Sequence, residues 1–260
     1  MNRINKLCNE NKNRKLLSLY FCAGCPTLEG TGNVILTLQE RGIDMIEVGI
    51  PFSDPLADGP VIQSAGTVAL KNGMTLRLLF QQLKEIKGKV RIPLVMMGYL
   101  NVIMHYGIEE FCKSCVECGV SGMIIPDLPF KDYIDDVKPV ADRYDLRVIM
   151  MITPETSDDR IRFIDNNTDG FIYMVSSASI TGAQKCFDEA KQDYFRHINS
   201  MNLRNPRMIG FGISNKQTLD SANANAAGAI IGSKFVTLLN DSNGDAEKAI
   251  DNLYEALEKG

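Results

Sequence analysis

The stretch IEVGIPFSDPLADGP, residues 46–60, begins as an apolar strand and ends as a proline-rich loop. Its first part belongs to the run DMIEVGI, residues 44–50, in which apolar residues follow one another instead of alternating with polar ones. Such runs are typical of parallel strands that are covered on both faces. One acid, Glu47, interrupts this run, and a carboxylate inside a buried strand needs a partner or a function.

Seven further runs of the same kind lie on either side of residues 44–50. They are LSLYFCA (17–23), IPLVMMG (92–98), GMIIP (122–126), RVIMMIT (147–153), GFIYMVS (170–176), RMIGFG (207–212) and GAIIGS (228–233). Helical patterns separate them. Eight βα units in 260 residues predict an α/β fold, a single (β/α)8 TIM barrel that fills residues 1–260 as one domain. A doubly wound parallel sheet is the alternative.

The helical patterns are clearest where apolar residues recur every three or four positions. The stripe Leu76, Leu79, Phe80, Leu83 and Ile86 predicts one helix, and 108–115 predicts another that Gly119 would end. Similar stripes lie before Gly42 and within residues 245–260. Ile4, Leu7 and Cys8 predict an extra N-terminal helix before the first strand.

Composition excludes several classes of function. Net charge is −4, and no basic tract offers a surface for nucleic acid or anionic membrane. We find no apolar run near the roughly 18 residues that a membrane helix needs. The seven cysteines, an odd number, fit reduced thiols better than a disulfide framework. We therefore expect a cytoplasmic protein.

The period of two along a strand gives Glu47 its direction. Met45, Glu47 and Gly49 share one face, while Ile46, Val48 and Ile50 form the β-branched face that suits packing under helices. Glu47 should therefore point into the barrel near the carboxyl end of its strand, where barrel enzymes place their chemistry. Burial there would raise its pKa toward neutrality, as general acid/base catalysis requires. A structural ion pair is the alternative.

The loop that follows favours catalysis. Pro51, Pro55 and Pro60 stiffen it, and it brings a second acid, Asp58, next to a glycine. Asp54 precedes a proline and is interpreted as a turn or surface residue.

Glycines near the end of the chain predict a phosphate site. GFGIS (210–214) and GAIIGS (228–233) place Gly and Ser where a strand ends and a helix begins, and ITGA (180–183) adds another glycine. Backbone N–H groups at such helix starts bind anions without a lysine. In (β/α)8 barrels, the loops after the last two strands commonly form the phosphate-binding site.

Other chemistry is set aside. CKSCVEC (112–118) has iron–sulfur-like spacing, but Cys112 and Cys115 continue the apolar stripe of a helix and are interpreted as buried thiols. No lysine lies inside a predicted strand, which argues against a Schiff-base aldolase.

The motif at 46–60 closely resembles the signature of the tryptophan synthase alpha subunit family. PDLP (126–129), SITGA (179–183), GFGIS and GAIIGS occur in the family's order, so the resemblance covers nearly the whole chain. It implies a lyase of tryptophan biosynthesis that cleaves indole-3-glycerol phosphate to indole and glyceraldehyde 3-phosphate by a retro-aldol step. A non-catalytic subunit that activates its partner and another phosphate-binding barrel enzyme, such as a sugar-phosphate isomerase, are the competing hypotheses.

The resemblance also implies roles for single residues. Glu47 would be the acid/base, Asp58 would hold the indole N–H, and Tyr173 would lie beside Glu47 as a third catalytic residue. Further contacts are implied for substrate at Tyr20, Met97, Tyr99, Met151 and Thr181, and for phosphate at the backbone of Gly182, Gly212, Gly232 and Ser233. Ser177 and Ser179 stand where many relatives have Arg and Gly, which leaves closure of that loop open.

The family implies a partner. No cofactor or metal is expected in this chain, because the pyridoxal phosphate of the family belongs to a beta subunit. The expected assembly is an α2β2 complex in which indole passes to that subunit.

Overall fold

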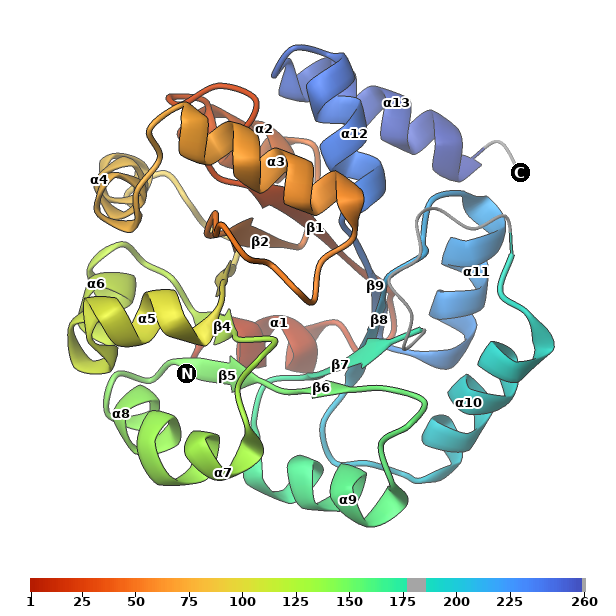
Figure 1. Ribbon diagram of the computed structural model, residues 1–260. Coiled ribbons are helices and arrows are strands. Elements are labelled where there is room, and N and C mark those ends of the chain that lie inside the picture. The colour runs from red at the N-terminus through yellow and green to blue at the C-terminus, as the bar shows by residue number, and fades with distance from the viewer. Residues whose placement is uncertain (177–185, 259–260) are drawn as a thin grey trace.

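Short parallel strands curl into a barrel in the computed structural model, which describes residues 1–176 and 186–258. The strands are β1 (Leu16–Cys22), β2 (Met45–Gly49), β3 (Leu94–Met97), β4 (Gly122–Ile124), β5 (Arg147–Ile149), β6 (Met151–Ile152), β7 (Ile172–Val175), β8 (Arg207–Gly210) and β9 (Gly228–Ile231). Figure 1 shows them as an inner ring with helices outside. The predicted α/β barrel is confirmed, whereas the extent of the domain over residues 1–260 stays a prediction.

The ring of strands is completed by the pairing of β1 with β9 and by the chain that joins β5 to β6. The chain's first and last strands pair, with Leu16 opposite Gly228, and the sheet order runs β5-β4-β3-β2-β1-β9-β8-β7-β6. The predicted strand at 147–153 differs from the structure, because it is divided into β5 and β6 around Met150. β5 pairs with β4 and β6 pairs with β7. The strand therefore changes neighbour at Met150, whose carbonyl accepts from the amide of Tyr173 at 3.0 Å.

Helices surround this ring. They are α1 (Arg3–Glu10), α2 (Thr31–Glu40), α3 (Pro60–Lys71), α4 (Leu76–Ile86), α5 (Leu100–Tyr106), α6 (Ile108–Glu117), α7 (Phe130–Asp132), the π-helix η1 (Tyr133–Val137), α8 (Lys138–Arg143), α9 (Asp158–Asn167), α10 (Glu189–Ser200), α11 (Lys216–Asn225), α12 (Ser233–Asp241) and α13 (Ala246–Glu258). The predicted stripe of α4 is its buried face, and the Thr75 side chain accepts from the amide of Leu78 to cap it. Gly119 follows α6 with φ +79°, a left-handed conformation that suits glycine.

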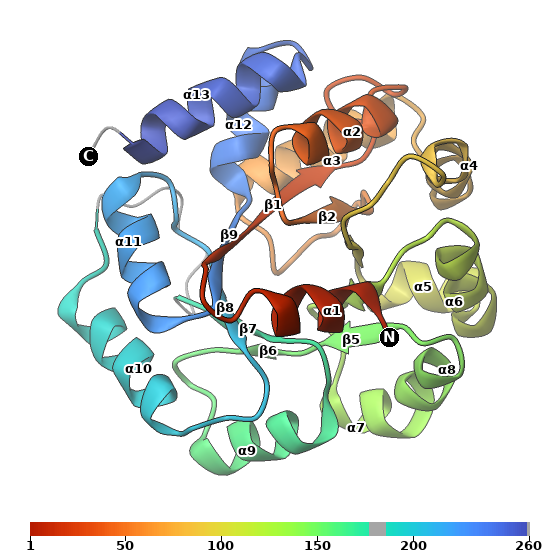
Figure 2. The same ribbon diagram turned by 180° about the vertical axis from the view of Figure 1, so that it is seen from behind.

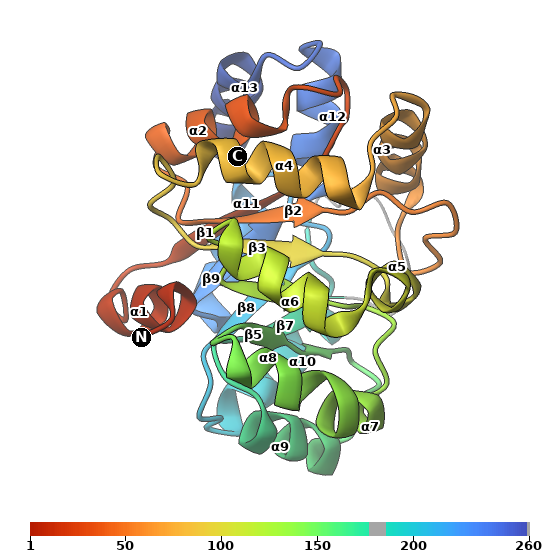
Figure 3. The same ribbon diagram turned by 90° about the vertical axis from the view of Figure 1, so that its left-hand side faces the viewer.

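The predicted N-terminal helix, α1, covers one end of the barrel. Figure 2 shows it lying across the strands at that end, and Figure 3 places it opposite the loop that follows β2. Just before α1, the Asn2 amide donates to the carbonyl of Ser121 at 2.8 Å, and Ile4 is fully buried. Because α1 closes the amino ends of the strands, the loops at the carboxyl ends remain for a site.

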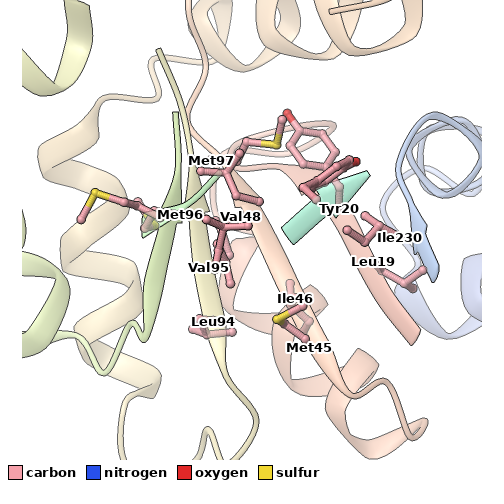
Figure 4. Close-up of a cluster of buried hydrophobic side chains, with 14 of the residues drawn as sticks. Leu19, Tyr20, Met45, Ile46, Val48, Leu94, Val95, Met96, Met97 and Ile230 are labelled. Carbon is pink, nitrogen blue, oxygen red and sulfur yellow. The ribbon is translucent and has the colours of Figure 1, made fainter. Parts of the chain in front are cut away.

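The interior of the barrel is filled by side chains from alternate strand positions. Figure 4 shows Tyr20 and Met97 at one end of the strand layer, beyond Met45 and Leu94. Cys112 and Cys115 are fully buried, as the interpretation of a helix stripe predicted. Among the described helices, none combines the length and the apolar character that crossing a bilayer requires.

We predict that the closing strand pair tolerates no side chain at Gly228. A Cβ there would lie 2.2 Å from the carbonyl oxygen of Leu16, which is backbone and cannot move aside. Gly228→Ala should therefore lower the free energy of unfolding by about 2–3 kcal/mol in urea titrations. Gly88→Ala is the matched control, because nothing lies within 4 Å of its Cβ position. Equal stability of the two variants would contradict this account of barrel closure.

Candidate active site

Glu47 lies inside the barrel with none of its surface exposed. It is on β2, opposite Tyr20 of β1 and Val95 of β3. The Ser18 hydroxyl donates to Oε1 at 3.3 Å, while Oε2 is buried without a hydrogen-bond partner among the described residues. Burial raises the pKa of Glu47 to about 8, and the Ser18 hydrogen bond opposes that rise. The carboxyl group is therefore poised to exchange a proton near neutral pH.

Asp58 is the second carboxylate of the site and belongs to the loop between β2 and α3. The hydroxyl of Tyr99 donates to its Oδ2 at 2.9 Å and accepts from the amide of Ala57 at 3.0 Å. Phe52 stacks on Tyr99 with ring centroids 5.1 Å apart. Burial raises the pKa of Asp58, and the Tyr99 bond opposes the rise. Tyr99 thus holds one oxygen of the Asp58 carboxylate in place.

Glu47 and Asp58 line one open cavity. The other residues that line it are Tyr20, Ile62, Met97, Tyr173, Phe211, Gly212, Ile213, Ser214, Ile230, Gly232, Ser233 and Lys234. They come from β1, β2, β3, β7 and β9, from the loops after β2, β8 and β9, and from the first turns of α3 and α12. The apolar side chains among them suit a flat aromatic ligand, and the two acids suit groups that donate hydrogen bonds.

Two tyrosines owe their positions to glycines on neighbouring strands. A Cβ at Gly49 would lie 2.2 Å from the hydroxyl oxygen of Tyr20, and one at Gly210 would lie 2.1 Å from that of Tyr173. Each glycine therefore leaves the space that the tyrosine hydroxyl occupies. Burial raises the pKa of both phenols well above its ordinary value, and the Glu47 and Asp58 carboxylates contribute to the rise, so both phenols stay neutral.

The side of the cavity formed by α12 and the loop after β8 has backbone features that favour an anion. Gly232 is the N-cap of α12 and has no side chain to cap the helix, so among the described residues no side chain occupies the first-turn amides that could bind an anion. Gly212 has φ +76°, and Phe211 before it has φ +66°. Asp145, Asn202 and Asn243 are the other described non-glycine residues with positive φ, and Asn and Asp tolerate that conformation. An aromatic residue there is unusual and indicates a constrained turn.

The structure brings together most of the predicted site residues. Glu47, Asp58, Tyr173, Tyr20, Met97, Gly212, Gly232 and Ser233 line the same cavity. Met151 pairs with Tyr173 across β6 and β7 but does not line the cavity, and Tyr99 contacts Asp58 without lining the cavity itself. Thr181 and Gly182 lie outside the described residues. The roles of all these residues stay predictions.

Sequence reasoning missed Lys234 and several apolar wall residues, Phe211 among them. Lys234 follows the predicted Gly–Ser pair on the first turn of α12 and lines the cavity. The position of this cation directly after GAIIGS was a usable signal, because side chains of a first helical turn lean toward the helix start. Phe211 could have been found as the residue between the two glycines of GFGIS.

We predict that Glu47 makes stability depend on pH. An unfolded Glu has a pKa of about 4.3, whereas the native group has one of about 8. Between these values the native state binds the extra proton, so the free energy of unfolding falls as pH rises through this window. Glu47→Gln removes this dependence. Its stability relative to wild type should improve by on the order of 3 kcal/mol between pH 5 and pH 9 in urea titrations.

The control for this measurement is Glu29→Gln, which changes an exposed carboxylate in the loop before α2. It should track wild type at every pH. A Glu47→Gln variant whose difference from wild type is the same at pH 5 and pH 9 would show that Glu47 has no raised pKa.

Comparisons with known proteins point to one family. The family model described as "Tryptophan synthase alpha chain" matches residues 7–259. The chain is 66% identical over 257 residues to the tryptophan synthase alpha chain of Phocaeicola vulgatus, covering 99% of both chains. It is 63% identical to that of Bacteroides thetaiotaomicron, covering 99% of this chain and 100% of the relative.

Solved structures are similar over the same length. The tryptophan synthase alpha chain from Legionella pneumophila superposes with a TM-score of 0.88 at 30% identity, covering 100% of this chain and 97% of that one. The tryptophan synthase subunit from the hyperthermophile Pyrococcus furiosus gives a TM-score of 0.84 at 31% identity, covering 94% and 97%. From its sequence, its barrel and these relatives, the chain belongs to the tryptophan synthase alpha chain family.

Proposed function

We propose that Glu47 and Asp58 in this cavity carry out the reaction of the family, the cleavage of indole-3-glycerol phosphate to indole and glyceraldehyde 3-phosphate. The chain is accordingly a carbon–carbon lyase of tryptophan biosynthesis. One observation supports the assignment most directly. A fully buried carboxyl group, one of whose oxygens has no hydrogen-bond partner among the described residues, lines the same cavity as the start of α12, which no described side chain caps. An acid/base thus lies across from an anion site, as a phosphorylated substrate requires.

The chemistry begins with a proton. With a pKa of about 8, Glu47 is mostly protonated at neutral pH and can deliver its proton to carbon 3 of the indole ring. The ring then carries positive charge as an iminium ion, and the bond from carbon 3 to the glycerol chain breaks. Its electron pair restores the aromatic ring as the ionised Glu47 takes the proton of the adjacent glycerol hydroxyl, whose oxygen becomes the aldehyde of glyceraldehyde 3-phosphate.

Asp58 is proposed to hold the indole N–H during this step. Its carboxylate stabilises the positive charge that reaches the ring nitrogen once carbon 3 is protonated. Tyr99 keeps one oxygen of Asp58 engaged at 2.9 Å, which orients the other toward the cavity. Tyr99 is therefore proposed as a positioning residue for Asp58 and not as a direct substrate contact.

The phosphate is proposed to bind at the start of α12. Gly212, Gly232 and Ser233 offer backbone amides there. Lys234 adds a cation, and within the described ranges its ammonium has neither a hydrogen bond nor an ion pair. Because a dianion enters a cavity that already contains two carboxyl groups, a cation near the phosphate lowers the electrostatic cost of binding. That Thr181 and Gly182 join this site stays a prediction.

The family name carries a proposal about assembly. We propose that the chain works with a tryptophan synthase beta subunit in an α2β2 complex and that pyridoxal phosphate belongs to the beta subunit. The loop around Asp54 and Pro55 would face that subunit, and the next residue, Leu56, is 85% exposed. We also propose a cytoplasmic location, which is supported by seven cysteines that are all free thiols.

The reaction is tested by supplying the purified chain with indole-3-glycerol phosphate and measuring indole release, with and without a beta subunit. Glu47→Gln should lower kcat by about 10²- to 10⁴-fold, because the group that donates and accepts the proton is lost. It should still bind glycerol 3-phosphate with nearly wild-type affinity. Glu29→Gln is the control and should turn over normally. Unchanged turnover in Glu47→Gln would exclude Glu47 as the acid/base.

The phosphate role of Lys234 has a separate test. Lys234→Ala should raise KM about tenfold, leave kcat within about twofold and weaken the dependence of kcat/KM on salt, because one charge contact to the phosphate is lost. Lys216→Ala is the matched control, since Lys216 is an exposed lysine on α11 that pairs with Asp220. A KM equal to that of the control would show that the backbone amides bind phosphate without Lys234.

A further inference from the structure

We propose that Ser18 is a positioning residue for Glu47, holding one carboxyl oxygen so that the other faces the substrate. The proposal deepens the function assigned to Glu47 and rests on it. No role was predicted for Ser18 from the sequence, where it is one serine within the apolar strand LSLYFCA.

Ser18 occupies a layer of the barrel that is closed to solvent. It pairs with Met45, whereas Tyr20 pairs with Glu47, so Ser18 lies one pleat deeper than Glu47 along neighbouring strands. It is fully buried and does not line the cavity. A buried hydroxyl without a hydrogen bond is costly, and strands favour β-branched or aromatic residues at such positions. A serine here therefore calls for a polar partner.

Glu47 is that partner. The Ser18 hydroxyl donates to Oε1 at 3.3 Å, and Oε2 has no partner among the described residues. Since Glu47 lines the cavity, Oε2 is the oxygen left for the substrate. The single hydrogen bond fixes the rotation of the carboxyl group. Oε1 is then held by Ser18, and Oε2 exchanges the proton with the substrate.

A hydroxyl suits this task better than an amide or a cation. Serine can donate to the ionised carboxylate and can also accept from the protonated acid. The bond between Ser18 and Glu47 can therefore persist while the proton leaves Oε2 and later returns. A lysine in the same place would lock Glu47 in its ionised form and prevent it from starting the reaction as an acid.

Other groups face Glu47 from several elements but do not replace Ser18. The titratable or charged side chains of the cavity are Tyr20 from β1, Asp58 from the loop after β2, Tyr173 from β7 and Lys234 from α12. The neighbour on β3 is the apolar Val95. Ser18 is the one described side chain with a hydrogen bond to Glu47. Loss of its hydroxyl should therefore leave the carboxylate without a donor.

The experiment compares Ser18→Ala, which removes the hydroxyl, with Ser18→Thr, which retains it. The pKa of Glu47 is read from 13C-carboxyl-labelled glutamate by NMR in the full-length chain, with Glu47→Gln used to assign the signal. In Ser18→Ala this pKa should rise by about one unit, since a hydrogen bond to the ionised form is lost. In the dependence of kcat/KM on pH, the apparent pKa that belongs to Glu47 should rise by the same amount. At pH 7 Glu47 stays protonated in both proteins, but its carboxyl group is no longer held in one orientation, so kcat should fall about tenfold. The affinity for glycerol 3-phosphate should stay unchanged.

Ser18→Thr should restore both the pKa and kcat to near wild type. Ser18→Cys keeps the side-chain volume with a weaker donor and should fall between the two, which covers the case in which threonine does not fit. An unchanged pKa of Glu47 in Ser18→Ala, or equal upward shifts in all three variants, would overturn the proposal. Failure of wild type to release indole would instead overturn the proposed reaction, and the NMR titration would still decide the role of Ser18.

Discussion

The whole site depends on the closure of a parallel barrel around one carboxyl group. Because β1 pairs with both β2 and β9, every second residue of these strands points into the interior of the barrel. Glu47 is in that space and has no exposed surface. Its burial, and not an ion pair, sets its pKa. In an open sheet the same residue would be hydrated and would remain an ordinary carboxylate.

This constraint explains how the two ends of the cavity differ. The strand side provides neutral hydroxyls and the buried acid, arranged by the pleat. The loop side provides backbone amides at the start of α12 and in the turn after β8, arranged by helix geometry. A substrate with an aromatic ring at one end and a phosphate at the other matches this polarity. The glycines opposite Tyr20 and Tyr173 show that the cavity's shape is set by backbone positions with no side chain.

Much of this could be predicted from local patterns. Apolar runs located the strands because covered parallel strands avoid polar residues, and the period of two placed Glu47 inward. The neighbour change at Met150 could not be predicted, because it is a matter of which strands lie on either side, β4 for β5 and β7 for β6, and a single sequence does not show that. The π-helix η1 was also missed. Pro139 in α8 has no N–H to donate to a carbonyl four residues earlier. The preceding amide, that of Lys138, donates to the carbonyl of Tyr133, five residues earlier, as in a π-helix.

Tyr99 and Ser18 show a second limit. Their partners, Asp58 and Glu47, are 41 and 29 residues away along the chain. A hydrogen bond across that separation leaves no periodic trace in a single sequence. Tyr99 could be placed near the end of its strand but not against Asp58, and Ser18 passed as an ordinary strand residue. Sequence motifs can thus identify the residues proposed to react. The residues that position their side chains can be identified only from the three-dimensional structure.

The left-handed backbone of Phe211 has a consequence for how this chain can change over time. Substitution by glycine or asparagine, which tolerate a positive φ, would relieve the backbone strain of that turn. Each of them would also withdraw the aromatic ring that forms part of the cavity wall and that meets Tyr173 edge to face at 6.0 Å. Stability of the fold therefore favours glycine or asparagine at position 211, whereas the cavity wall requires the aromatic ring. In a chain no longer selected for activity, glycine or asparagine should replace Phe211 over time.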